Sequence, residues 1–232
     1  MRSYIGLLGS LFSACAMASP SAYLFGGSQP DGFAGQVLEI KLIDGSSIIA
    51  STSESPIGTE ANAENLGWWS DTLGHFAGNY NYLAGYNGVL GNNVRNFFSF
   101  DLSGVTGEVA SATLKLTSYS ASFPFSQMKY DIFDVSTSAE QLLSESSVPN
   151  AYIFDDLGSG KSYGTLLVNQ DPGYSAEFSI QLTSHAVADI NARQGQYFSI
   201  GGSVTSVPEP ESALMVMAGL LAIGISCRKP RR

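Results

Sequence analysis

Two stretches, RNFFSFDLS at 95–103 and ATLKLT at 112–117, carry the clearest structural pattern in this sequence. In the first, Phe98, Phe100 and Leu102 occupy every second position, and in the second apolar residues alternate with Thr and Lys. Successive side chains of a strand point to opposite faces of its sheet. The alternation therefore predicts two strands that each bury one face and expose the other.

The same alternation recurs along the middle of the chain. An Asp-Gly pair at 44–45 separates two such segments and predicts a hairpin. Short helices are expected over 138–144, capped by Ser136 or Ser138, and from Thr183 or Ser184 through Arg193. The other segments with strand-like patterns are 36–43, 46–50, 128–135, 164–168, 176–182 and 197–204. Many short strands with few helices predict an all-β fold, an antiparallel β-sandwich with one or two short helices.

The N-terminal 18 residues have the parts of a secretory signal peptide. A basic residue precedes an apolar run at 4–17, which would form the signal helix, and Ala16 and Ala18 form an Ala-x-Ala cleavage site. Export would then use the Sec machinery. A buried N-terminal helix and lipoprotein processing at Cys15 are the alternatives.

Residues 206–232 contain three parts in a fixed order. Pro208, Glu209 and Pro210 come first and predict an extended segment, because proline fixes φ and lacks a backbone donor. The apolar run 213–226 follows. As a helix it would span about 21 Å, which is short of a bilayer core of about 30 Å. The last five residues include four basic ones, and such charges stay in the cytoplasm.

This order resembles the PEP-CTERM sorting signal of bacteria that make exopolysaccharide. The resemblance covers 207–232 and implies recognition by exosortase, a membrane-embedded cysteine protease that cuts near the motif. Pro208, Glu209 and Pro210 would be the recognition residues. The C-terminal transmembrane helix would anchor the protein transiently in the inner membrane before release to the cell surface, outer membrane or extracellular matrix. A permanent anchor behind a proline-rich linker is the alternative.

The part between the two ends is expected to fold as one domain over 36–205, preceded by a linker at 19–35. The stretch 95–103, followed by 112–116, looks like jelly-roll modules of secreted bacterial proteins. Together with GWWS at 67–70, it is similar to what many PEP-CTERM proteins carry. The resemblance implies a jelly-roll-like sandwich and brings no established activity.

Charge and cysteine content limit the function classes. Removal of both ends would leave six basic and 18 acidic residues, a net charge of −12. Such acidity argues against nucleic acid or anionic lipid as a partner. The two cysteines, Cys15 and Cys227, lie in the segments to be removed. The mature body would therefore contain no disulfide and no thiolate metal site.

The sequence contains no recognisable catalytic motif. His75 and His185 lack a metal-ligand spacing, and neither a hydrolase elbow nor a phosphate-binding glycine loop is present. We therefore predict no enzymatic activity and no cofactor. Oxygen-rich loops with Asp71, Asp155 and Asp156 could hold a structural calcium ion, whereas the adjacent pair at 155–156 more simply caps a loop.

Aromatic residues concentrate between 68 and 86: Trp68, Trp69, His75, Phe76, Tyr80, Tyr82 and Tyr86. Exposed rings could stack on sugars, which makes Trp68, Trp69, Tyr80 and Tyr82 candidate glycan contacts. Alternatively, the rings fill the core beneath a long loop.

Three functions remain in order of preference. The first is a non-enzymatic cell-surface or matrix protein of a biofilm-forming bacterium. The second is a carbohydrate-binding module for exopolysaccharide. The third is a hydrolase, which would need two facing carboxylates about 5 to 9 Å apart.

Overall fold

The computed structural model describes residues 21–27, 36–57, 64–78, 80–88, 91–124, 127–169, 173 and 176–207. The predicted signal peptide, with Ala16 and Ala18, and the predicted sorting tag, with Pro208, Glu209 and Pro210, lie outside the described residues. In the described part of the chain, no helix has the length and apolarity needed to cross a membrane.

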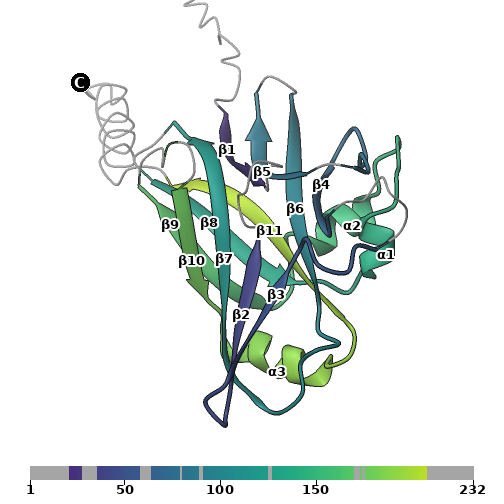
Figure 1. The fold of residues 1–232 in the computed structure, drawn as a ribbon. Helices are drawn as coiled ribbons and strands as arrows, with labels where there is room; N and C mark the ends of the chain where they lie inside the picture. The colour runs from purple at the N-terminus through teal and green to yellow at the C-terminus, as the bar shows by residue number, and fades with distance from the viewer. Residues whose placement is uncertain are drawn as a thin grey trace, which may run out of the picture.

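The described residues form eleven strands that join in one antiparallel sheet (Figure 1). Neighbours along the sheet follow the order β3-β2-β7-β1-β5-β6-β11-β8-β9, while β10 also pairs with β7 and β4 with β6. The bounds are β1 (Ala22–Gly27), β2 (Val37–Leu42), β3 (Ser47–Ser51), β4 (Leu66–Ser70), β5 (Asn81–Asn87), β6 (Asn92–Asp101), β7 (Val109–Ser122), β8 (Gln127–Asp134), β9 (Ser162–Val168), β10 (Ala176–Gln181) and β11 (Tyr197–Val207). The predicted all-β, antiparallel character is confirmed.

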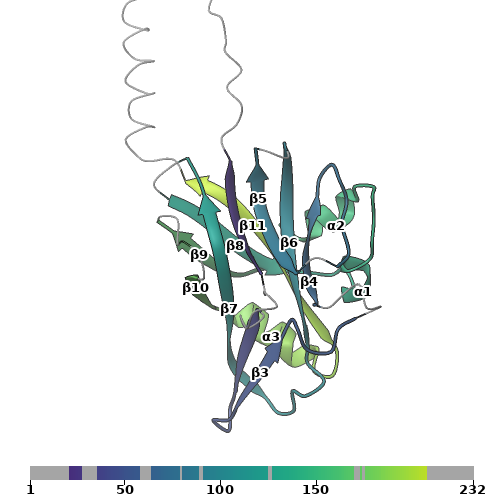
Figure 2. The same cartoon turned by 45° about the horizontal axis from the view of Figure 1, so that its top comes forward.

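The sheet curls until β9, at one end of this order, approaches β10, which pairs with β7 near the other end, and the result is a sandwich-like body (Figures 1 and 2). Strands β9 and β10 lie side by side, and the Thr183 amide just beyond β10 donates a hydrogen bond of 2.9 Å to the Tyr163 carbonyl in β9. Gly164 lies against the Ile180 side chain, where a Cβ would have no room. The curl therefore encloses a core between its two halves.

The core consists of the inward-facing residues of both halves. Phe98, Phe100 and Leu102 are all buried in it, as the alternation predicts, and Lys115 lies exposed on the outer face of β7. The hairpin at 44–45 is also confirmed, since β2 and β3 pair antiparallel and Gly45 has a φ of +87°. Other core members include Leu24, Leu38, Ile40, Tyr82, Leu114, Leu116, Tyr130, Ile132, Phe198 and Ile200.

The described residues contain three helices, one more than the upper limit expected. α1 (Ala139–Leu142) begins at Ser138, whose side chain accepts a hydrogen bond from the Gln141 amide. α3 (Ser184–Ala192) closes one end of the curl with Ala186 and Ile190 in the core. The unexpected helix is α2 (Ala151–Asp156), which is capped by the Asn150 side chain. Its six residues are too few to show a helical period in the sequence.

α1 and α2 cover the outer face of the sheet where β4 and β6 meet, so the part of β6 around Phe97 is buried on both faces. Trp69 and Phe97 pack there against Leu142, Ile153 and other residues of a second, smaller core. The Trp69 indole also donates a 3.0 Å hydrogen bond to the Leu142 carbonyl at the end of α1.

The predicted linker at 19–35 is wrong in its first half. β1 lies in the middle of the sheet, with β5 on one side and β7 on the other. Its sequence, AYLFGG, is too short and too glycine-rich for a clear alternation. The glycine at 26 is nevertheless required, because an added Cβ would overlap the Thr117 carbonyl of β7.

Candidate functional site

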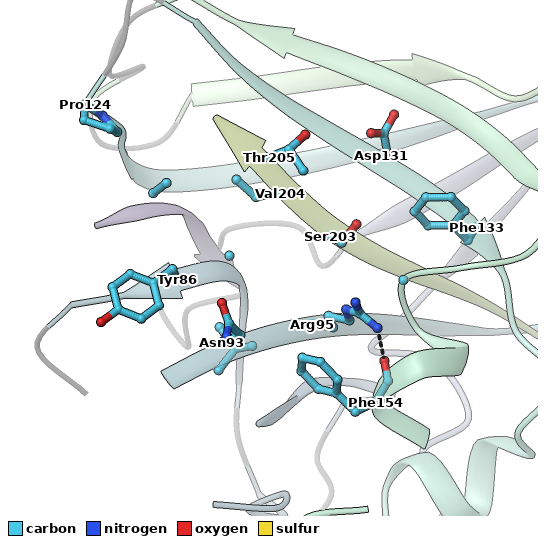
Figure 3. Close-up of a pocket in the computed structure, with 14 residues that line it drawn as sticks. Tyr86, Asn93, Arg95, Pro124, Asp131, Phe133, Phe154, Ser203, Val204 and Thr205 are labelled. Atoms are coloured by element: carbon cyan, nitrogen blue, oxygen red, sulfur yellow. Dashed lines mark hydrogen bonds between the residues drawn. The ribbon is translucent and has the colours of Figure 1, made fainter. Parts of the chain in front are cut away.

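A groove of about 990 Å³ crosses the outer face of the sheet over β5, β6, β11 and β8 (Figure 3). Because side chains alternate along a strand, every second residue of each strand reaches this face. The groove residues are Asn93 and Arg95 on β6, Ser203 and Thr205 on β11, and Asp131 and Phe133 on β8. Tyr86 on β5 lies at one end, and Phe154 of α2 forms a wall near the other.

Asp131 is the carboxylate among the described groove residues, and its neighbours hold it in place. It pairs with Ser203 across the β8–β11 ladder. Its Oδ2 atom lies 2.8 Å from the Lys129 ammonium, and its Oδ1 atom accepts a hydrogen bond from the Thr165 hydroxyl. The carboxylate is therefore compensated in charge and fixed in orientation.

Arg95 is the cation of the groove, and α2 orients it. Its Nη1 atom donates a 2.7 Å hydrogen bond to the Phe154 carbonyl, and the guanidinium carbon lies 4.2 Å from the Phe154 ring centre. Gly158 leaves space for the guanidinium, because a Cβ there would overlap it. Burial lowers the pKa of the Arg95 guanidinium, and the nearby Asp155 opposes the shift; arginine nevertheless remains charged in proteins.

The two acidic residues at the end of α2 have different partners. Asp155 approaches Arg95 Nη1 at 3.4 Å and is 74% exposed, so this ion pair is weak. Asp156 accepts hydrogen bonds from the backbone amides and hydroxyls of Ser136 and Thr137. The pair at 155–156 lies on a helix, but the interpretation that it caps a loop is confirmed for Asp156.

The calcium candidates do not come together with other acidic side chains. Asp71 binds the backbone amide and the side-chain amide of Asn93 on β6, whereas Asp156 is occupied at the loop before α1. Across the described ranges, no group of three or more His, Cys, Asp or Glu side chains is placed to hold a metal ion.

Two of the four predicted glycan contacts are buried, and this part of the prediction is wrong. Trp69 is 1% exposed in the smaller core, and Tyr82 is fully buried in the main core. The physical reason is that β4 and β5 are covered on the faces that carry these rings. The alternative, that rings of this segment fill the core, holds for both residues.

The other two predicted contacts reach the surface. Tyr80 is 47% exposed. Trp68 is half-buried and meets the exposed Phe76 at an interplanar angle of 61°. Because these two rings are not coplanar, they do not form a flat stacking platform.

The two histidines lie in different surroundings. His75 is buried between Trp69, which stacks on it at 5.4 Å, and Phe97. Desolvation lowers the pKa of the His75 imidazole, although a contact between its Nδ1 atom and the Trp68 carbonyl at 2.9 Å acts in the opposite direction. His185 lies exposed on α3.

The sequence did not reveal the groove, because its residues come from strands that are far apart along the chain. Arg95 is the first residue of the stretch 95–103, and nothing in the neighbouring sequence distinguishes it from any exposed arginine. The groove offers hydroxyl and amide groups, two fixed opposite charges and three half-buried aromatic rings, a combination suited to binding a polar ligand with apolar faces.

Comparison of the chain with protein-family models, curated proteins and solved structures finds no match.

Proposed function

We propose that this chain is an exported, non-enzymatic cell-surface or extracellular-matrix protein, sorted and processed by exosortase in an exopolysaccharide-producing bacterium. The observation that carries the proposal is the order of parts at the C-terminus: Pro208, Glu209 and Pro210, then a short apolar run, then a basic end. The signal peptide with Ala16 and Ala18 supports the same topology, because both ends place the body outside the cell.

The arrangement of the body supports removal of both ends. β1 begins at Ala22, after the predicted cleavage at Ala18, and β11 ends at Val207, before Pro208. The start of β1 and the end of β11 lie at the same end of the fold, opposite α3 (Figures 1 and 2). Cleavage at both predicted sites would therefore leave all eleven described strands in the mature protein. We further propose that this body is a jelly-roll-like sandwich.

The groove residues do not form the carboxylate pair that the third candidate, a hydrolase acting on glycosides, would need. Two facing carboxylates are the usual requirement for glycoside hydrolysis. Among the described groove residues, Asp131 has no second carboxylate opposite it, and it is already engaged by Lys129 and Thr165.

The intact mass of the protein recovered from the native cell surface tests the sorting proposal. We expect a wild-type mass that begins near Ser19 and ends near Pro208, and we expect this product to disappear in a Pro208→Ala/Pro210→Ala variant. A mass that retains Arg232 in both strains would show a permanent anchor and contradict the proposal. Glu211→Ala, just outside the Pro-Glu-Pro motif, is the matched control and should be processed normally.

Carbohydrate binding is the second candidate function, and the groove favours it. Sugars present hydroxyls at their edges and apolar C–H faces, and the groove combines polar side chains with the rings of Tyr86, Phe133 and Phe154. In this proposal exopolysaccharide is the partner, and the surface location brings the groove to it.

A further inference from the structure

We infer that the groove over β5, β6, β11 and β8 binds an uncharged, hydroxyl-rich polysaccharide chain. The inference rests on the proposed carbohydrate-binding function and specifies its site and ligand class. It replaces the ring cluster at 68–82 as the contact surface and depends on four features of the groove: its charge balance, its unused polar groups, its aromatic rings and its open shape.

The charges of the groove cancel locally. Arg95 has Asp155 beside it, and Asp131 has Lys129 at 2.8 Å. A polyanion would gain little from Arg95, which is only 26% exposed, and would meet Asp131 and an acidic body. Fixed and compensated charges can still exchange strong hydrogen bonds with neutral hydroxyls. The charge pattern therefore favours a neutral ligand.

Several polar groups of the groove remain available for a ligand. Within the described residues, the hydroxyls of Ser203 and Thr205 make no hydrogen bond, and the bonds of Arg95 all use Nη1 rather than Nη2. Asn93 donates to Asp71 through its amide nitrogen, which leaves its Oδ1 atom as an acceptor. The lining thus offers both donors and acceptors, as vicinal sugar hydroxyls require.

Aromatic rings stand at both ends of this polar row. Tyr86 lies at one end, and Phe133 and Phe154 lie near Arg95 (Figure 3). All three are half-buried, so each leaves part of its ring exposed to the groove. Rings placed in this way can pack against the apolar faces of successive sugar units.

The shape of the groove favours a chain over a single small molecule. The groove lies across four neighbouring strands of the sheet face and is not an enclosed cavity. A polymer segment could therefore lie along it with both ends in solvent.

Affinity gel electrophoresis of the protein purified from its own cells tests the inference. The gels would contain neutral polymers (mixed-linkage β-glucan, xylan, galactomannan or dextran) or the acidic polymer alginate. We expect retardation by at least one neutral polymer and none by alginate. The affinity should stay within about twofold when salt rises from about 50 to 500 mM, because screening acts on charge–charge attraction.

Two groove variants and one matched control locate the site. Tyr86→Ala should weaken binding at least about tenfold by removing a ring. Gly158→Ala should also weaken it, because the new methyl group would displace the Arg95 guanidinium from its position against α2 without removing its charge. Tyr80→Ala removes an exposed ring outside the groove and should leave binding unchanged. Circular dichroism and thermal unfolding would establish that each variant is folded.

Several results would overturn the inference. Retardation by no neutral polymer would exclude the ligand class, and salt-sensitive binding to alginate would show a polyanion site instead. A loss of binding in Tyr80→Ala but not in Tyr86→Ala would move the site to the 68–82 segment, which would keep carbohydrate binding but reject the groove. The mass measurement on the cell-surface protein is independent of all these outcomes, so failure here leaves the sorting proposal intact.

Discussion

Replacing Trp69 with alanine should strongly destabilise the fold. Trp69 is 1% exposed, stacks on His75 and packs with Phe97 beneath α1. Large-to-small substitution of a buried tryptophan costs about 3–5 kcal/mol. The Leu142 carbonyl also loses its indole donor, a bond worth about 1 kcal/mol. Since domains of this kind are stable by about 5–15 kcal/mol, the variant should lose a large share of its free energy of unfolding.

Urea unfolding followed by far-ultraviolet circular dichroism measures this loss without depending on tryptophan fluorescence. Trp68→Ala is the matched control, because it removes the same ring from the next position, where the ring is half-buried, contacts Phe76 and donates a long hydrogen bond of 3.4 Å to Asn81 Oδ1. We expect Trp68→Ala to lose less than half the free energy of unfolding that Trp69→Ala loses. The loss in Trp69→Phe should lie between these two values, since this variant keeps an aromatic ring but loses the hydrogen bond.

A free energy of unfolding for Trp69→Ala within about 1 kcal/mol of wild type would contradict this packing. A larger loss in Trp68→Ala than in Trp69→Ala would contradict it as well. Either result would mean that α1 and α2 do not cover β4 as described. Trp69 would then be available at the surface, and the original prediction that it contacts glycan would be open again.

Two further predictions concern pH and packing. Burial in the folded state lowers the pKa of His75, so the unfolded chain binds the proton more readily than the folded one. The free energy of unfolding should therefore be greatest at a pH above 6.5, the ordinary pKa of histidine, and it should fall as the pH drops below that value. Urea titrations between pH 7.5 and 5 should show this decline in wild type and in His185→Gln, and a decline that persists in His75→Phe would assign it to other groups. Gly201→Ala places a Cβ 2.6 Å from the Leu157 carbonyl at the end of α2 and should cost about 1–3 kcal/mol in thermal unfolding. A Cβ at Gly104 would meet nothing within 4 Å, so Gly104→Ala should leave the thermal stability nearly unchanged. An equal loss of stability in both variants would contradict the contact between Gly201 of β11 and the end of α2.

Local patterns in the sequence were sufficient for most of the elements. The alternation in 95–103 and 112–117 placed β6 and β7, and the Asp-Gly pair placed the β2–β3 hairpin. These features are readable because burying one face of a strand imposes a period of two on neighbouring residues. The same reading located α3 and the cap of α1, since capping also depends on residues close in the chain.

Tertiary packing decided the features that have no local period. β1 became a central strand because β5 and β7 supply its hydrogen-bond partners from distant segments. Trp69 is buried because α1 and α2 cover it. α2 is too short to show a helical period, and no local pattern shows which strands the two helices cover.

The candidate site depends even more on the complete fold. Arg95, Asp131 and Ser203 belong to β6, β8 and β11, and they meet because β11 inserts between the other two strands. No spacing along the chain encodes that neighbourhood, because strand order is a property of the whole sheet. The proposed sorting motif is the opposite case: Pro208, Glu209 and Pro210 are contiguous, so the sequence alone specifies them, whereas the groove exists only once eleven strands have found their partners.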